Sequence, residues 1–155
     1  MLFEKIINIF DFYHQKRIIN YFKKLNLKYF IDVGAHKGEF LSYILSLNYK
    51  KIYCFEPQKK IFFKILYKNF KNKKNVQLFN LGLANKNSNI IFYENKLTST
   101  STFSKSINTP FSKIKNLILN SKNSYIDKYP VNVRTLDEIF INKKIDNLFL
   151  KIDVE

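Results

Sequence analysis

The stretch FIDVGAHKGEF, from Phe30 to Phe40, decides the fold, because a short apolar run leads directly into two glycines. The 155 residues contain only 3 glycines, and two of them, Gly34 and Gly38, lie in this stretch. Glycine tolerates a positive φ and lets another group come close to the backbone. We therefore predict a strand that ends at Gly34, a helix that begins near Gly38, and a ligand-binding loop between them.

The segments on either side of the loop alternate between strand and helix patterns. Apolar runs predict strands in Lys28–Gly34, Lys50–Pro57 and, followed by a loop, Asn75–Asn85. Apolar residues at helical spacing predict helices over Lys37–Asn48 and Gln58–Phe70. Strands that alternate with helices in this way form a parallel sheet with right-handed crossovers. The fold class expected is α/β, with helices on both faces of a Rossmann-like sheet.

The second half of the sequence predicts three more strands and a short helix. We expect two strands, in Asn89–Asn95 and at the start of Tyr129–Phe140, on an edge of the sheet, and a loop around the STST run between them. Thr135 suits the N-cap of the short helix, and Glu138 is at the capping-box position. The strongly apolar stretch IDNLFLKIDVE, Ile145–Glu155, predicts a fully buried strand.

Composition indicates one globular domain. Hydrophobic residues make up 46% of the chain, which excludes a disordered protein. Residues 1–27 have helical spacing, with His14 on the expected surface, so we predict an N-terminal helical segment before a domain over residues 28–155. That segment has neither a run long enough to span a bilayer nor a small-residue cleavage site. Cys54 is the one cysteine, which fits a core position and a cytoplasmic protein without disulfides.

The formal net charge of +15 raises the possibility of a nucleic-acid partner. The basic residues are nearly all lysines, with Arg17 and Arg134 as the only arginines, whereas base and phosphate recognition favours arginine. Lysine runs such as KNFKNKKN are more typical of solvated surface positions. We therefore expect no specific nucleic-acid partner, and a nucleic-acid methyltransferase or binding protein is kept as an alternative function. No Cys/His cluster has zinc-like spacing, so no metal site is predicted.

Polar residues end each of the predicted parallel strands, and carboxyl ends of parallel strands are where such sheets bind ligands. These residues are Asp32, Glu56, Asn80, and the pair Asp153 and Glu155. An acid about 20 residues after the first strand commonly binds ribose hydroxyls, which suits Glu56. Asn80, with Gly82 close behind, suits the edge of a purine ring. The pattern predicts a nucleoside site.

The first loop indicates which nucleoside. Its pattern is D-x-G-x-x-x-G rather than the G-x-G-x-x-G of dinucleotide folds, and Asp32 precedes the first glycine. A carboxylate at that point would repel a pyrophosphate. It suits the ammonium and sulfonium groups of S-adenosylmethionine (SAM), so SAM is the cofactor predicted.

The segments FIDVGAHKGEF, CFEP, NLGLAN, VNVRTLDE and LFLKIDVE occur in an order and spacing that resemble the FkbM-type methyltransferases, a family of class I SAM-dependent enzymes. The resemblance runs from Tyr29 to Glu155. It implies a class I methyltransferase sheet and methylation of a hydroxyl on a sugar, glycolipid or secondary metabolite. It therefore implies a small-molecule or glycan acceptor.

The resemblance also assigns roles to residues. The SAM loop would consist of Asp32, Gly34, Ala35, His36 and Gly38. Glu56, with Pro57 beside it, would hold the ribose, and residues 80–84, including Asn80 and Gly82, would lie near the adenine. Lys151, Asp153 and Glu155 would face the methyl group and the acceptor as the catalytic residues. Either acid could act as base or metal ligand, and Asp153 could instead contact the amino-acid part of SAM.

One feature departs from the family pattern. In FkbM-type enzymes KIDVE is normally followed by a glycine, a helix and further strands, whereas this sequence stops at Glu155. We therefore expect a C-terminally truncated domain whose last strand, central in the family, has an unpaired apolar edge. A non-catalytic fragment of the same fold is a further alternative.

Overall fold

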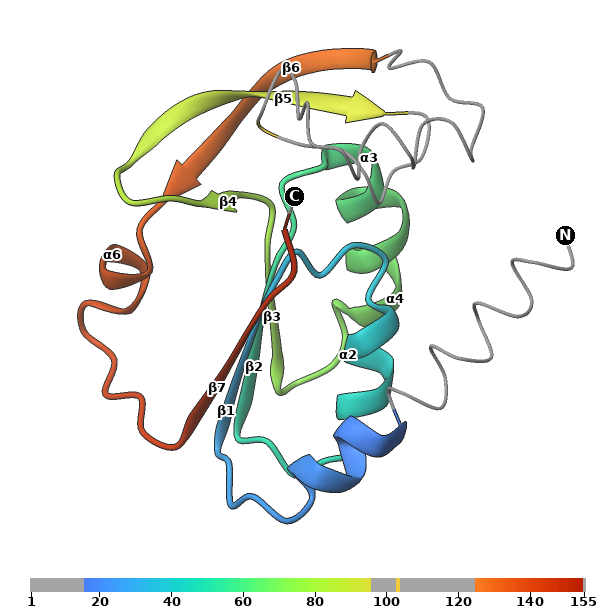
Figure 1. The fold of residues 1–155 in the computed structure, drawn as a ribbon, viewed down its shortest axis with the longest axis vertical. Coiled ribbons are helices and arrows are strands. Elements are labelled where there is room, and N and C mark those ends of the chain that lie inside the picture. The colour runs from blue at the N-terminus through green and yellow to red at the C-terminus, as the bar shows by residue number, and fades with distance from the viewer. Residues whose placement is uncertain (1–15, 96–102, 104–124, 155) are drawn as a thin grey trace, which may run out of the picture.

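The computed structural model describes residues 16–95, Phe103 and residues 125–154, and its centre is a parallel sheet (Figure 1). Three predictions lie wholly outside these residues: the surface position of His14, the STST loop, and the catalytic role of Glu155. The N-terminal helical segment is described only from residue 16 onward, and residues 16–22 are helical.

The central sheet has four strands in the order β3-β2-β1-β7. These are β1 (Tyr29–Val33), β2 (Lys51–Phe55), β3 (Val76–Phe79) and β7 (Leu148–Ile152). Every neighbouring pair is parallel, and Val33 lies opposite Phe55 on one side and Ile152 on the other. The carboxyl ends of the strands therefore meet at one edge, as the sequence predicts.

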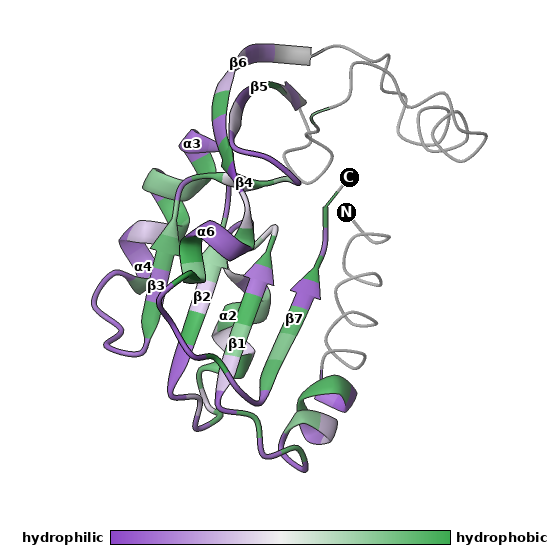
Figure 2. Ribbon diagram, turned by 90° about the vertical axis from the view of Figure 1, so that its left-hand side faces the viewer, coloured by the Kyte–Doolittle hydropathy of each residue, from purple (hydrophilic) through white to green (hydrophobic). Residues whose placement is uncertain are grey.

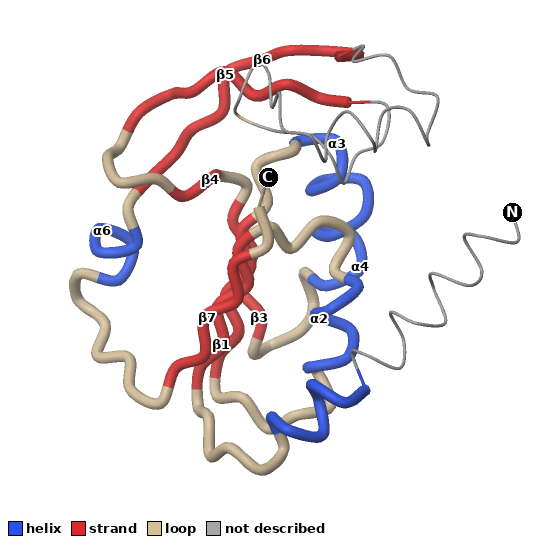
Figure 3. The backbone as a smooth tube through the Cα atoms, viewed as in Figure 1, coloured by secondary structure: helices blue, strands red, loops and turns tan. Residues whose placement is uncertain are grey.

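Helices cover both faces of this sheet, which confirms the Rossmann-like α/β prediction (Figures 1 and 3). One face carries residues 16–22, α2 (Glu39–Ile44) and a continuous helix made of α3 (Lys59–Ile61), η1 (Phe62–Tyr67) and α4 (Lys68–Phe70). The opposite face carries α6 (Leu136–Phe140). The predicted helix over residues 58–70 thus forms, with a π-helical turn, η1, in its middle.

Two apolar cores hold the layers together, one on each face of the sheet. On the side of α2, the fully buried Phe30 and Ile52 contact Leu41 and Leu66 from the helices. Cys54 lies in the same core with no exposed surface, and burial raises the pKa of its thiol well above the usual value. The core role predicted for Cys54 is therefore confirmed. On the other side, strand residues of β1 and β2 pack against α6.

The strands predicted at the sheet edge form a second, separate sheet, so that prediction was wrong. This sheet has the order β4-β6-β5, with β4 (Gly82–Leu83), β5 (Ser88–Asn95) and β6 (Tyr125–Arg134). The chain turns after β3, where the Asn80 side chain bonds back to the carbonyl oxygens of Glu56 and Pro57 at 2.9 and 3.2 Å. Gly82 then pairs with Val133 of β6 instead of extending β3.

β7 is not fully buried, contrary to the prediction. Leu148, Leu150 and Ile152 are 39%, 39% and 64% exposed, while Phe149 on the opposite side of the strand packs into the core. β7 is the edge strand of the sheet in the part of the chain described, with β1 as its neighbour there (Figure 2). Its alternating exposure arises because one face of the strand is covered by the core and the other faces solvent.

The start of α6 is capped, but only partly as predicted. Thr135 Oγ1 accepts a hydrogen bond from Glu138 N at 3.2 Å, so Thr135 is the N-cap. The backbone N–H of Thr135 donates to Asn87 Oδ1 at 3.0 Å, not to Glu138. Glu138 instead pairs with Arg134 Nη1 at 3.6 Å, so the capping-box role predicted for Glu138 was wrong.

Thr135→Ala should lower the free energy of unfolding by about 1 kcal/mol, because the N-cap hydrogen bond is lost. Thr135→Ser keeps a hydroxyl at the same place and should lose only a few tenths of that amount. Urea unfolding of the two variants checks this. Equal losses in Thr135→Ala and Thr135→Ser would show that the hydroxyl bond does not stabilise α6.

Candidate active site

The loop after β1 is built around left-handed backbone. Gly34 and Gly38 have φ values of 81° and 84°, and His36 between them has a φ of 49°. The N–H groups of Gly34 and Ala35 both donate to the carbonyl oxygen of Phe55 at 3.0 Å, which fixes the loop to the end of β2. A Cβ on Gly34 would collide with the backbone carbonyl oxygen of Asp153. One on Gly38 would strike the ring of Phe70, so each glycine allows a close contact that a side chain would prevent.

Glu56, at the tip of β2, joins this loop to the start of α3. Its Oε2 accepts a hydrogen bond from His36 N at 2.8 Å, and its Oε1 accepts one from Gln58 N at 2.7 Å. The residue is only 5% exposed. Burial raises the pKa of Glu56, and the two backbone N–H bonds oppose that shift. The tips of β1 and β2 therefore meet, as the predicted nucleoside site requires.

Asp32 forms an ion pair with Lys151 beneath the loop. The distance from Lys151 Nζ to Asp32 Oδ1 is 2.9 Å, and Lys151 also lies 3.3 Å from Asp153 Oδ2. Burial raises the pKa of the fully buried Asp32 even though Lys151 opposes the shift. Burial lowers the pKa of Lys151, but attraction to Asp32 and Asp153 outweighs it and the net direction is upward. The cost of burial therefore outweighs the ion-pair attraction at Asp32, which is the more deeply buried residue, but not at Lys151.

A cavity of about 630 Å³ lies at the carboxyl edge of the central sheet, next to β4. Its walls come from the tips of β1, β2 and β7, from the turn and strand after β3, and from the start of α6. The residues that line it are Val33, Gly34, Phe55, Pro57, Leu81, Gly82, Leu83, Ala84, Asn85, Phe103, Thr135, Leu136, Asp137, Ile152 and Val154. The walls are mostly apolar with a few polar groups, which is typical of a site for a small organic ligand.

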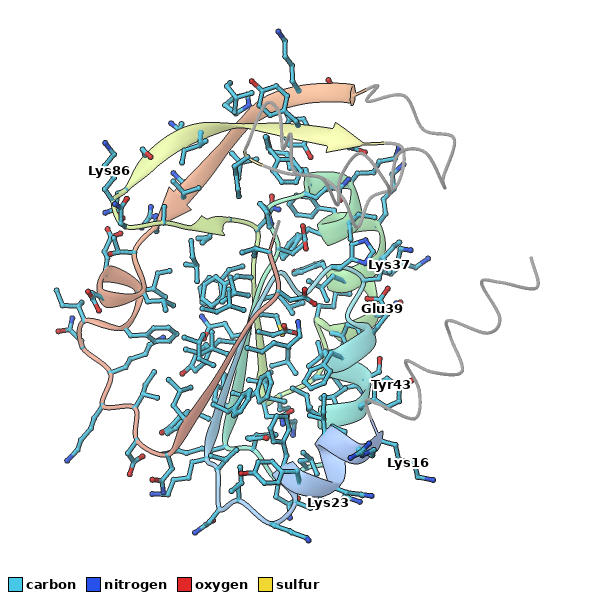
Figure 4. All side chains as sticks on the ribbon, viewed as in Figure 1. Lys16, Lys23, Lys37, Glu39, Tyr43 and Lys86 are labelled. Atoms are coloured by element: carbon cyan, nitrogen blue, oxygen red, sulfur yellow. The ribbon has the colours of Figure 1, made fainter. Side chains whose placement is uncertain are left out.

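The cavity includes some of the predicted site residues and not others. Gly34, Pro57 and Gly82 line it. The other described residues of the predicted site lie in or around the loop without lining the cavity: Asp32, Ala35, His36, Gly38, Glu56, Asn80, Lys151 and Asp153. Their ligand and catalytic roles stay predictions. Lys37, before the start of α2, points outward from the loop (Figure 4). The Glu39 carboxylate turns back to the loop, where its Oε2 accepts a hydrogen bond from Lys37 N at 3.2 Å and its Oε1 lies 3.3 Å from His36 Nδ1.

Sequence reasoning missed the contribution of α6 to the site. Thr135, Leu136 and Asp137 line the cavity, and Asp137 is the only ionisable side chain among the described lining residues. The segment VNVRTLDE was predicted to form a strand and the start of a helix, with no role in a site. Its place at the cavity depends on β6 returning to the carboxyl edge beside β4, and no local pattern signals that return.

These features define a class of protein: a Rossmann-like fold with a glycine loop, a strand-tip acid and an apolar cavity at the carboxyl edge of its parallel sheet. The sequence profile described as the methyltransferase FkbM domain matches residues 32–155, and the chain belongs to this family of methyltransferases. No curated protein and no solved structure matches the chain. Membership implies an enzyme that uses a methyl donor. Within the described residues, no helix has the length and apolarity needed to cross a membrane.

Proposed function

We propose that the cavity binds S-adenosylmethionine and that the protein methylates a hydroxyl group on a sugar, glycolipid or secondary metabolite. The observation that carries this proposal is the cavity itself, which lies between the glycine loop, the tip of β2 and the start of α6. Its volume of about 630 Å³ is in the range of sites for ligands the size of a nucleoside. The single buried cysteine agrees with a cytoplasmic location, which we also propose.

The residues at the cavity fit this cofactor. Gly34 presents bare backbone where the cofactor would lie, and the apolar side chains of Phe55 and Leu81 would pack against the adenine. Glu56 does not itself line the cavity, but each of its oxygens accepts one backbone N–H bond, so each keeps a lone pair for a ribose hydroxyl. When bound, SAM supplies an activated methyl group on a positively charged sulfur.

Asp137 is the further residue that we assign to the nucleoside. It is the acidic residue among those that line the apolar cavity in the described part of the chain, and a carboxylate accepts hydrogen bonds from hydroxyl or amino groups. It would thereby fix one polar edge of the cofactor. Such a bond is stronger than one between neutral groups, so it contributes more to affinity.

The acceptor hydroxyl must approach the methyl group in line and lose its proton to a base. Of the predicted catalytic residues in the described part of the chain, Asp153 is better suited to be this base than Lys151. The Asp153 side chain is 77% exposed just beyond the tip of β7. Lys151 is 21% exposed and holds Asp32 and Asp153, which suits a positioning role.

Calorimetry with SAM and S-adenosylhomocysteine tests the cofactor assignment. We expect saturable binding of both ligands. Asp137→Asn should weaken it about tenfold, the loss of one charged hydrogen bond. Ala84→Trp should abolish it by filling the cavity, whereas Ser46→Ala, which is remote from the cavity, should bind like the unmodified chain. If a chain that unfolds cooperatively in urea gives no saturable heat with either ligand, the assignment is wrong.

A further inference from the structure

The outer face of the helix formed by α3, η1 and α4 combines exposed aromatic rings with lysines. We name this surface the aromatic–lysine face; its residues are Lys59, Lys60, Phe63, Lys64, Tyr67, Lys68 and Lys71, and all are exposed. Phe63 and Tyr67 are 57% and 44% exposed, which is unusual for large rings with an apolar core close by. Neither ring lines the cavity at the carboxyl edge.

The two rings lie next to each other on the outside of the helix. Phe63 makes an edge contact with the buried Phe62, with ring centroids 5.0 Å apart, and lies 6.4 Å from Tyr67. Both belong to η1, and residues four apart are neighbours on the surface of a helix. Lys71 Nζ lies 5.8 Å from the centre of the Tyr67 ring. The rings thus form a short apolar ridge along the outside of the helix.

The charge around this ridge has one sign. Residues 58–75 contain seven lysines and no acidic residue. None of the salt bridges between described residues involves a lysine of the aromatic–lysine face. A partner of this surface must therefore be anionic, and it must also accept two protruding aromatic rings.

We propose that the aromatic–lysine face binds an anionic phospholipid bilayer. A helix that lies on a membrane buries its apolar side chains at the boundary of headgroups and acyl chains, and lysines beside them attract anionic lipids. A single-stranded nucleic acid also stacks on aromatic rings, but its proteins hold it in a groove. The aromatic–lysine face is the convex side of a helix, and all its basic residues are lysines, which favours the membrane.

This inference goes beyond the proposed methyl transfer, because it concerns a different face of the molecule and requires no cofactor. Of the acceptors proposed above, a glycolipid is the one found at such a surface. Vesicle binding is measured without SAM, so its failure would leave the cofactor assignment untouched. A failure of SAM binding would likewise leave the membrane inference untouched.

The test uses Phe63→Trp as a reporter, because the chain contains no tryptophan. Vesicles of phosphatidylcholine mixed equally with phosphatidylglycerol should shift its emission to the blue, and vesicles of phosphatidylcholine alone should not. In co-sedimentation, Lys64→Glu/Lys68→Glu and Phe63→Ala/Tyr67→Ala should each weaken binding to anionic vesicles at least about tenfold. Circular dichroism and cooperative unfolding confirm that each variant is folded.

The matched control is Lys23→Glu/Lys24→Glu, which makes the same charge change on exposed lysines elsewhere. Lys23 lies at the opposite end of the molecule from α3 (Figure 4). The control should weaken vesicle binding less than about threefold, the residual effect of net charge. Equal losses in the two charge variants would overturn the proposal in favour of nonspecific attraction. Tighter binding to a single-stranded oligonucleotide than to vesicles, lost in Lys64→Glu/Lys68→Glu, would overturn it in favour of nucleic acid.

Discussion

Gly34→Ala is expected to lower the free energy of unfolding by about 2–5 kcal/mol and to remove cofactor binding. Holding an alanine in the left-handed region costs about 1–2 kcal/mol, and Gly34 has a φ of 81°. The added Cβ would also collide with the carbonyl oxygen of Asp153, and relieving such overpacking costs about 1–3 kcal/mol. Urea unfolding and SAM calorimetry measure the two losses.

Two further variants separate the causes. Gly34→Asn should lose less unfolding free energy than Gly34→Ala, because asparagine tolerates a positive φ. It should still lose some, because its Cβ keeps the collision with Asp153. Gly82→Ala is the matched control, since its Cβ would meet only side-chain atoms, Phe103 Cζ at 2.8 Å and Val133 Cγ1 at 3.0 Å, and its backbone is not left-handed. If Gly34→Ala lowered the free energy of unfolding no more than Gly82→Ala does, this explanation of the loop would be contradicted.

Lys151→Met is expected to destabilise the protein by about 3–5 kcal/mol at neutral pH, because it leaves the buried Asp32 carboxylate without its cation. Lys28→Met is the matched control. Lys28 Nζ lies 3.0 Å from Asp146, but both side chains are about half exposed, so the loss of that pair should barely move the unfolding midpoint.

The destabilisation of Lys151→Met should depend on pH. The pKa of Asp32 is already raised in the folded protein, and removal of Lys151 takes away an interaction that lowers it. An acid whose folded pKa lies above its unfolded value loses stability as the pH rises between the two. The deficit of Lys151→Met should therefore shrink as the pH is lowered from neutral toward the ordinary pKa of an aspartate. Asp32→Asn/Lys151→Met should recover much of the stability, and a pH-independent deficit would contradict the ion-pair explanation.

The sequence predicts the parallel half of the fold because its signals are local. The apolar run before Gly34, the proline after Glu56 and the helical spacing of residues 58–70 each depend on a few neighbouring residues. The turn at Asn80 that separates β3 from β4 depends on a side chain reaching back to β2. No periodicity in the sequence contains that contact, and for this reason the strands of the second sheet were predicted on an edge of the central sheet.

The candidate site likewise contains residues that local sequence signals predict and residues that only long-range contacts bring into place. Gly34 and Glu56 are found at strand tips by spacing alone, and the structure brings them to one edge. The pairing of Asp32 with Lys151 joins residues 119 apart in sequence. A lysine near the end of a strand predicts a surface or catalytic group as readily as a buried ion pair. Asp137 reaches the cavity only because β6 crosses above the sheet, so its role emerges from topology.

The carboxylate of Glu56 has a mechanical consequence. One of its oxygens holds the crossover after β1 and the other holds the crossover after β2, so the two segments form a single rigid rim. Neither can shift without the other. Glu56→Gln would replace one of those acceptor oxygens by an amide whose hydrogens face an N–H, so one of the two side-chain bonds that join the segments would be lost.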